Sequence, residues 1–94
     1  MEQINFSKSR SGHHKYQVIT PSGRTIHFGD RWYEHYKDTT PLGLFKHLDH
    51  LDQKRRSFYL KRHSKIVDKD GNLVYKDPES PSYYSWKYLW DGPD

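Results

Sequence analysis

Alternating apolar and polar positions near the start of the chain predict a β-hairpin. Residues 15–20 and residues 24–29 each alternate apolar with polar side chains, as strands do when one face is buried. Pro-Ser-Gly at 21–23 supplies a preset φ and then a residue that tolerates positive φ, which is typical of a tight turn. An isolated hairpin is only marginally stable in water, so another element has to cover one of its faces.

Helical spacing is found in residues 50–63, which contain neither Pro nor Gly and which we expect to form a central helix packed on the hairpin. Asp49 or Asp52 is placed to cap its start, because a carboxylate there accepts hydrogen bonds from unpaired backbone N–H groups. At about 100° per residue, one face of this helix gathers four apolar side chains. They are Leu48, Leu51, Phe58 and Tyr59.

Two arginines, Arg55 and Arg62, fall in the middle of that apolar face. An unpaired buried charge is prohibitive, so we expect both to be structural arginines that stack on rings and pair with carboxylates or carbonyl groups. The other three cations of the helix, Lys54, Arg56 and Lys61, then point into solvent. The helix is therefore predicted to present a basic outer surface.

Capping signatures mark two further segments. Thr-Pro at 40–41 predicts a capped helical segment that reaches residue 48, and Ser-Pro at 80–81 predicts the start of a short aromatic helix over residues 82–90. Asp-Lys-Asp-Gly-Asn at 68–72 predicts a turn.

The composition indicates one small domain whose core is made of rings. The chain has 94 residues, 32% of them hydrophobic, and half of that fraction is aromatic, so a few large rings must supply most of the burial. We predict a flexible basic arm over residues 1–14 and a single α+β domain over residues 15–94. The rings expected to form the core or a contact surface are Tyr33, Tyr36, Tyr59, Trp86 and Trp90. A platform on which bases stack is the alternative use of the C-terminal rings.

The net charge of +4 is concentrated in the central helix. Residues 52–63 contain five Lys or Arg and one Asp, and the remaining 11 basic and 11 acidic residues cancel. A basic surface favours acidic partners, although moderate positive charge is also common in proteins that need it only for solubility. The residues expected to meet nucleic acid or another acidic partner are Lys8, Arg10, Lys54, Arg56, Lys61 and Lys65.

Several classes of function find no support in the sequence. There is no cysteine, so disulfides and thiolate metal sites are excluded, and no apolar run is long enough for membrane insertion. The adjacent His13 and His14 lack further ligands at suitable spacing, so we predict no metal and no cofactor. His27, His50 and His63 would approach one another if the hairpin packed on the helix, but we interpret each as structural. We expect neither an enzyme nor a small-molecule substrate.

Several motifs resemble a known group of proteins. The chain contains Lys-Tyr at 15–16 leading to Pro-Ser-Gly-Arg at 21–24, Ile-His-Phe-Gly at 26–29, and Tyr-x-x-Tyr-Lys-Asp at 33–38. It also contains His-x-Asp-x-x-Arg-Arg-x-x-Tyr-x-x-Arg-His at 50–63 and Trp-x-Tyr-Leu-Trp at 86–90. Together they resemble a family of small proteins of large nucleocytoplasmic DNA viruses, of the mimivirus, phycodnavirus and iridovirus kinds. The resemblance implies a viral origin and a location in the virion or in the virus factory of the host cytoplasm or nucleus. It supplies no enzymatic activity to carry over to this chain.

Two functions remain open. In the first, the domain is a structural part of the virion, a minor capsid or cement protein that contacts larger viral subunits through the basic arm, an exposed Leu60 and exposed rings. In the second, it binds packaged DNA or RNA by neutralising phosphates without reading bases. The modest charge favours the first, because a DNA-compacting protein of this size is usually more basic.

Overall fold

The N-terminal part of the chain forms a three-stranded antiparallel sheet. In the computed structural model, which describes residues 4–93, the strands β1 (Asn5–Lys8), β2 (His14–Ile19) and β3 (Thr25–Asp30) lie in the order β1-β2-β3. Tyr16 of β2 lies opposite Phe28 of β3, so both rings point to the same face of the sheet. That face carries the core of the molecule.

The hairpin between β2 and β3 is as predicted. The turn closes at Gly23, whose φ of +86° is a conformation that favours glycine, and the backbone N–H of Thr20 donates to the carbonyl of Arg24. Tyr16, Val18, Ile26 and Phe28 are all buried, and β3 alternates as the sequence predicted. In the central strand β2 the alternation fails, because Lys15 and Gln17 on the opposite face are buried as well.

The predicted flexible arm differs from the structure. Residues 5–8 form the edge strand β1, which pairs with β2 from Asn5 opposite Ile19 to Lys8 opposite Tyr16. Phe6 packs edge-to-face on Tyr88, with ring centroids 4.9 Å apart, and this contact holds the strand against the helical part of the molecule. The segment is mostly polar, so the sequence analysis did not identify Phe6 as the apolar residue that anchors it. The first three residues of the predicted arm lie outside the described part of the chain.

The element that covers the sheet is the C-terminal helix α2 (Pro81–Tyr88), not the basic helix. Ser80 caps α2 by accepting a hydrogen bond from the N–H of Ser82, and Pro81 occupies its first turn, as predicted. Tyr84 and Leu89 are fully buried against the sheet and join its inward residues in one apolar cluster. The members of this cluster are Tyr16, Val18, Ile26, Phe28, Phe45, Tyr84 and Leu89.

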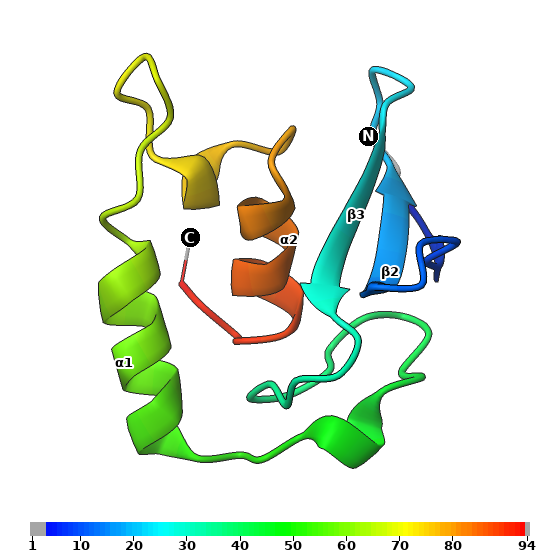
Figure 1. The fold of residues 1–94 in the computed structure, drawn as a ribbon, viewed down its shortest axis with the longest axis vertical. Helices are drawn as coiled ribbons and strands as arrows, with labels where there is room; N and C mark the ends of the chain where they lie inside the picture. Colours follow the sequence, from blue (N-terminus) through cyan, green and yellow to red (C-terminus); the bar gives the residue numbers. More distant parts are fainter. Residues whose placement is uncertain (1–3, 94) are drawn as a thin grey trace.

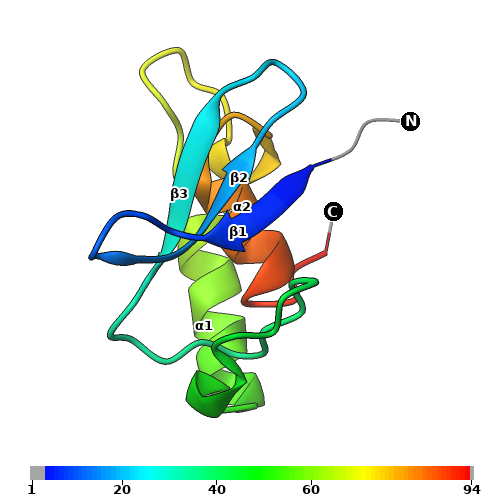
Figure 2. The ribbon, with the colours of Figure 1, turned by 90° about the vertical axis from the view of Figure 1, so that its right-hand side faces the viewer.

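The basic helix α1 (Gln53–His63) forms an outer layer. Asp52 caps it by accepting hydrogen bonds from the N–H groups of Lys54 and Arg55, as the sequence indicated. Figure 1 shows α2 between α1 and the sheet, and Figure 2, turned by 90°, shows the sheet in front of both helices. The predicted α+β class is confirmed, and the molecule is built as sheet, central helix and outer helix.

The connecting segments are mostly irregular. The helix expected over residues 40–48 is replaced by turns and one 3-10 turn, η1 (Lys46–Leu48), because the backbone here bonds to side chains instead of to itself. The turn predicted at 68–72 is present, with Asp68 accepting hydrogen bonds from the N–H groups of Asp70 and Asn72. A short turn, η2 (Val74–Lys76), leads into α2.

Candidate binding surface

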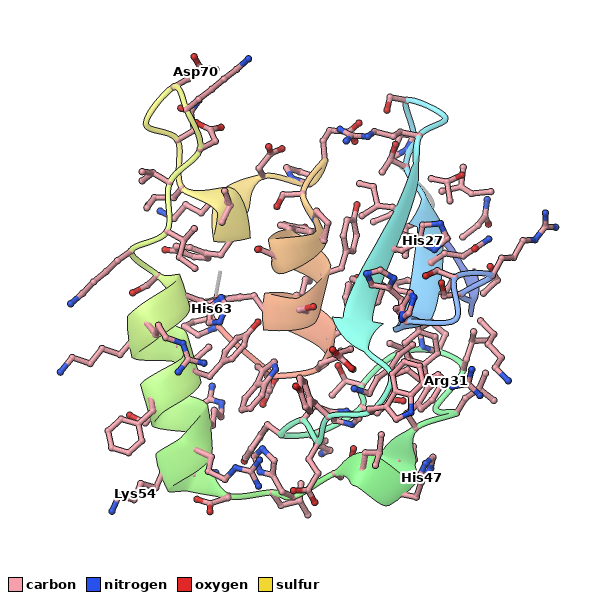
Figure 3. All side chains as sticks on the ribbon, viewed as in Figure 1. His27, Arg31, His47, Lys54, His63 and Asp70 are labelled. Atoms are coloured by element: carbon pink, nitrogen blue, oxygen red, sulfur yellow. The ribbon has the colours of Figure 1, made fainter. Side chains whose placement is uncertain are left out.

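One face of α1 presents three lysines and an aromatic ring to solvent. Lys54, Phe58, Lys61 and Lys65 recur at spacings of four, three and four residues, which places them in one row along the helix and its C-terminal extension. All four are exposed, and the Phe58 ring keeps 57% of its surface accessible. Figure 3 shows Lys54 pointing away from the body of the protein. We call these four residues the lysine face.

The lysine face is exposed because the opposite side of α1 is fixed to the C-terminal segment. Tyr59 is sandwiched between His63 and Trp90, with ring centroids 4.0 Å from each, and its plane is within 3° of the Trp90 plane. Only 9% of Tyr59 is accessible, and burial raises its pKa, so the phenol stays neutral. The stack determines the rotation of the whole helix.

The arginine that anchors α1 is Arg56, not Arg55 or Arg62. Arg56 donates from Nε to the carbonyl of Trp90 at 3.0 Å and also to the carbonyl of Asp91, and its guanidinium lies 5.4 Å from the Tyr36 ring centroid. The prediction that Arg56 is an exposed cation is therefore wrong. The sequence analysis assigned this structural role, stacking on a ring and pairing with carbonyl groups, to the neighbouring Arg55.

The two arginines expected to turn inward lie on the surface. Arg55 pairs with Glu34 at 3.0 Å, but both side chains are about half exposed, so the pair contributes little to stability. Arg62 is exposed, and its guanidinium has no hydrogen-bond or ion-pair partner within residues 4–93. The cause is a rotation of about one residue position: the inward row is 56, 59, 60 and 63, and Phe58, expected inside, faces solvent.

Electrostatically the lysine face is uncompensated. From residue 53 to residue 67 the sequence has no Asp or Glu. Arg55 is paired and Arg56 is engaged by carbonyls, so the cations left for a partner in this stretch are Lys54, Lys61, Lys65 and Arg62. Phe58, Lys61, Arg62 and Lys65 also line a shallow hollow on this surface.

The N-terminal cations belong to a different surface. Lys8 and Arg10 are exposed on β1 and the turn that follows it, and Figure 1 shows this part of the sheet on the other side of α2 from α1. Lys8 lines a hollow together with Arg31, Trp32 and His47, which the sequence analysis did not single out. The six predicted cations therefore do not form one patch.

The five rings predicted for the core or a contact surface have separate positions. Tyr36, Tyr59 and Trp86 are buried, Trp90 is half-buried in the stack with Tyr59, and Tyr33 is 70% exposed. Trp86 stacks on Tyr75 at 4.1 Å and donates from its indole nitrogen to the carbonyl of Pro93. The C-terminal rings are thus used in packing, which disfavours the base-stacking platform.

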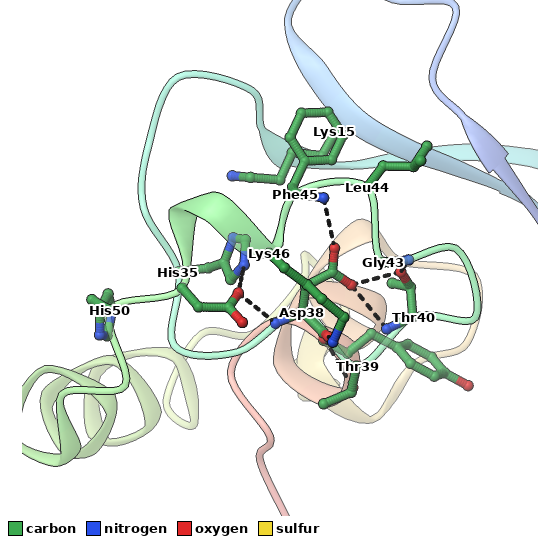
Figure 4. Close-up of polar contacts among 12 residues, drawn as sticks. Lys15, His35, Asp38, Thr39, Thr40, Gly43, Leu44, Phe45, Lys46 and His50 are labelled. Atoms are coloured by element: carbon green, nitrogen blue, oxygen red, sulfur yellow. Dashed lines mark hydrogen bonds and ion pairs between the residues drawn. The ribbon is translucent and has the colours of Figure 1, made fainter.

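A polar network that the sequence analysis missed organises residues 35–49. The carboxylate of Asp38 is fully buried and accepts hydrogen bonds from the Tyr16 hydroxyl, the Thr40 N–H and hydroxyl, and the Phe45 N–H (Figure 4). Burial alone would raise the pKa of Asp38, but these hydrogen bonds outweigh it and hold the pKa below its ordinary value. Asp38 therefore stabilises this irregular segment from inside the molecule.

A second carboxylate supports the same segment. Asp49 accepts a hydrogen bond from the backbone N–H of Asp38 at 2.8 Å and contacts Nε2 of His35 at 2.5 Å. His35 is buried, and burial lowers its pKa despite the opposing effect of Asp49. The neutral imidazole therefore donates from Nε2, and Nδ1 has no partner among residues 4–93. No local sequence pattern reveals this pairing, because His35 and Asp49 are 14 positions apart in the sequence.

The three histidines considered as a cluster do not come together. His27 lies in β3 and bonds through Nδ1 to the Ser9 hydroxyl, while His50 and His63 lie on opposite ends of a column formed with Trp90 and Tyr59. Figure 3 shows His27 on the sheet and His63 on α1. Among residues 4–93, no group of three or more His, Asp or Glu is arranged to hold a metal ion. In the same range, none of the helices combines the length and the apolar character needed to cross a membrane.

Comparison with known proteins finds one similarity. The model of a family described as a family of unknown function (DUF5754) matches residues 4–41. The match covers the three strands and the first part of the irregular segment, and it leaves both helices outside. No curated protein and no solved structure matches the chain. The resemblance to proteins of large DNA viruses therefore stays a prediction.

Proposed function

We propose that this domain is a non-enzymatic docking module, a structural component of a virion that attaches to larger viral subunits through the lysine face. The observation that carries the proposal is the Phe58 ring, held more than half exposed between lysines on a helix whose other side is fixed. Exposed aromatic side chains surrounded by polar groups are typical anchors of protein interfaces. The virion and virus-factory setting rests on the resemblance of the sequence motifs.

The charge of the lysine face specifies the partner's chemistry. Lys54 lies 6.0 Å from the centroid of the Phe58 ring, and Lys61 lies on the next turn of the helix. A complementary surface has an apolar recess that accepts the ring and carboxylates around its rim. Opposite charges at the rim would steer association and select the partner, while burial of the ring would supply most of the affinity.

Photocrosslinking at the lysine face tests the proposal. A benzophenone amino acid placed at position 58 in the full chain, expressed during infection, is expected to join this protein to one viral structural subunit. The same amino acid at position 70, in the exposed turn on the far end of the molecule, is the matched control and is expected to give no such product. Equal products from both positions, or none from either, would contradict docking through α1.

Nucleic-acid binding is the second candidate, and the absence of acidic residues between positions 53 and 67 favours it. A titration with duplex DNA at several salt concentrations separates the two. Phosphate binding requires that Lys61→Ala lower the salt slope by about one unit and that Phe58→Ala leave affinity nearly unchanged. Protein docking requires that Phe58→Ala abolish the crosslinked or co-purified complex, with DNA affinity low in the wild-type protein.

A further inference from the structure

A second pocket, which shares only Arg62 with the hollow beside the lysine face, lies where all three layers meet. It has a volume of about 270 Å³ and opens between the end of the sheet, the segment after β3, and the two helices. Lys15 and His35 are almost completely buried in its wall, and Tyr33 and Arg62 are exposed at its mouth. The pocket is large enough for a small ligand.

Three hydrogen-bond donors in this pocket are unused. The guanidinium of Arg62 and the hydroxyls of Tyr59 and Ser85 have no partner in the part of the chain that the structure describes. Tyr59 is the most informative, because its ring is 91% covered while its hydroxyl oxygen is not itself buried, so the hydroxyl stays accessible to a ligand. Burial keeps this phenol neutral by raising its pKa, so the hydroxyl remains a donor.

The pocket also has a buried positive charge in its wall. Only 1% of Lys15 is accessible, and its ammonium donates to the carbonyls of Asp30 and Tyr33, which leaves one N–H unused. Burial lowers the pKa of Lys15 to about 8, so the side chain is still charged at neutral pH. No carboxylate in residues 4–93 forms an ion pair with it, although the charges of Asp30 and Asp38 favour its charged form.

The two acidic residues of the lining offset only part of the positive charge. Glu34 is paired with Arg55 at 3.0 Å, and the Asp30 carboxylate accepts a hydrogen bond from the N–H of Trp32 at 2.9 Å. What remains directed at the pocket is a buried ammonium, a free guanidinium and two neutral hydroxyls. Nδ1 of His35, which has no partner within residues 4–93, is buried, and the positive charges of Lys15, Arg62 and Arg55 exceed the negative charges of Asp30 and Glu34 by one. This set of donors therefore suits an oxyanion.

We propose that this pocket binds a phosphate group. Arg62 pairs with two of the phosphate oxygens at the mouth, the Tyr59 and Ser85 hydroxyls donate to the others, and the Lys15 ammonium compensates the charge from behind. The phosphate is either the inorganic ion or the phosphoryl group of a small molecule whose organic part lies on the exposed Tyr33 ring. The site does not depend on docking through the lysine face.

Calorimetric titration of the intact protein with inorganic phosphate tests the site. Wild-type protein is expected to bind in a saturable manner, and Arg62→Ala to bind about tenfold more weakly, the loss expected for one charged hydrogen-bonding partner. Lys61→Ala is the matched control, since it removes an equal charge from the neighbouring position outside this pocket, and it should bind as the wild type does. Absence of saturable binding, or equal weakening by both substitutions, would overturn the proposal.

A second variant tests the pocket without disturbing the fold. Tyr59→Phe retains the ring between His63 and Trp90 and removes only the hydroxyl, so it is expected to fold normally and to bind phosphate more weakly. Wild-type affinity in this variant would contradict the assigned donor. Repeating the titration with a nucleoside monophosphate identifies the source: tighter binding than inorganic phosphate indicates an organic phosphate, and equal binding indicates the free ion.

Discussion

At the scale of single residues, the Asp38 carboxylate satisfies backbone N–H groups that a helix or a strand would otherwise satisfy. The segment from residue 31 to residue 45 contains no helix and no strand, yet its backbone N–H groups at Thr40 and Phe45 are satisfied by one carboxylate. The same carboxylate receives the hydroxyl of Tyr16 from the sheet. One side chain thus ties an irregular segment to the core, because buried donors without a partner would be costly.

We expect Asp38→Ala to lower the free energy of unfolding by at least about 3 kcal/mol, because several buried donors lose their acceptor at once. Urea denaturation followed by tryptophan fluorescence measures the change. Asp70→Ala, in an exposed turn, is the control and should change stability by less than about 0.5 kcal/mol. Similar midpoints for the two variants would show that the Asp38 network contributes no stability.

At the scale of elements, α1 is held by its contacts with the C-terminal segment. Its inward side is provided by Tyr59, His63, Arg56 and the half-buried Leu60. It therefore has no fully buried aliphatic side chain. The helix has eleven residues and would be marginal alone in water. Its stability therefore depends on the stack with Trp90 and on the two carbonyl groups that Arg56 bonds.

The adjacent arginines of α1 provide a matched comparison. Arg56→Ala is expected to lower stability by about 1–3 kcal/mol, because it leaves partly buried carbonyls unpaired and removes the contact with Tyr36. Arg55→Ala removes only an exposed ion pair and should cost less than about 1 kcal/mol. Thermal unfolding of both variants measures the difference, and the reverse order would place the anchor at Arg55.

The sequence predicts these elements better than it predicts their packing. Local signals identified the hairpin, the Asp52 cap of α1 and the Ser80 cap of α2, because turns and caps depend on residues only a few positions apart. The predicted orientation of α1 was wrong by about one residue position. Tyr59 stacks on Trp90, 31 positions later in the sequence, and no local pattern reveals that contact. The Asp38 network was missed for the same reason.

At the scale of the whole molecule, several neutral histidines make the fold sensitive to acid. Burial lowers the pKa of His14, His35, His50 and His63 below the ordinary value of 6.5. Below pH 6.5 the unfolded chain therefore binds more protons than the folded protein does. Because unfolding then takes up protons, stability falls as the pH falls.

We expect the urea midpoint to be lower at pH 5.5 than at pH 7.5. His63→Phe keeps a ring stacked on Tyr59 and removes one titrating group, so the difference between the two pH values should become smaller. His47→Gln, at an exposed position, serves as the control and should leave the difference unchanged. A midpoint independent of pH in the wild-type protein would contradict this assignment of neutral histidines.

The layer order also constrains how the molecule is made. The central helix α2 is synthesised after both the sheet and α1, the two layers that it joins. A nascent chain that ends before α2 therefore holds a three-stranded sheet with an uncovered apolar face and a short helix with no ring to stack on. Folding of this domain therefore has to wait for α2, and until then the apolar face of the sheet is exposed to non-native contacts.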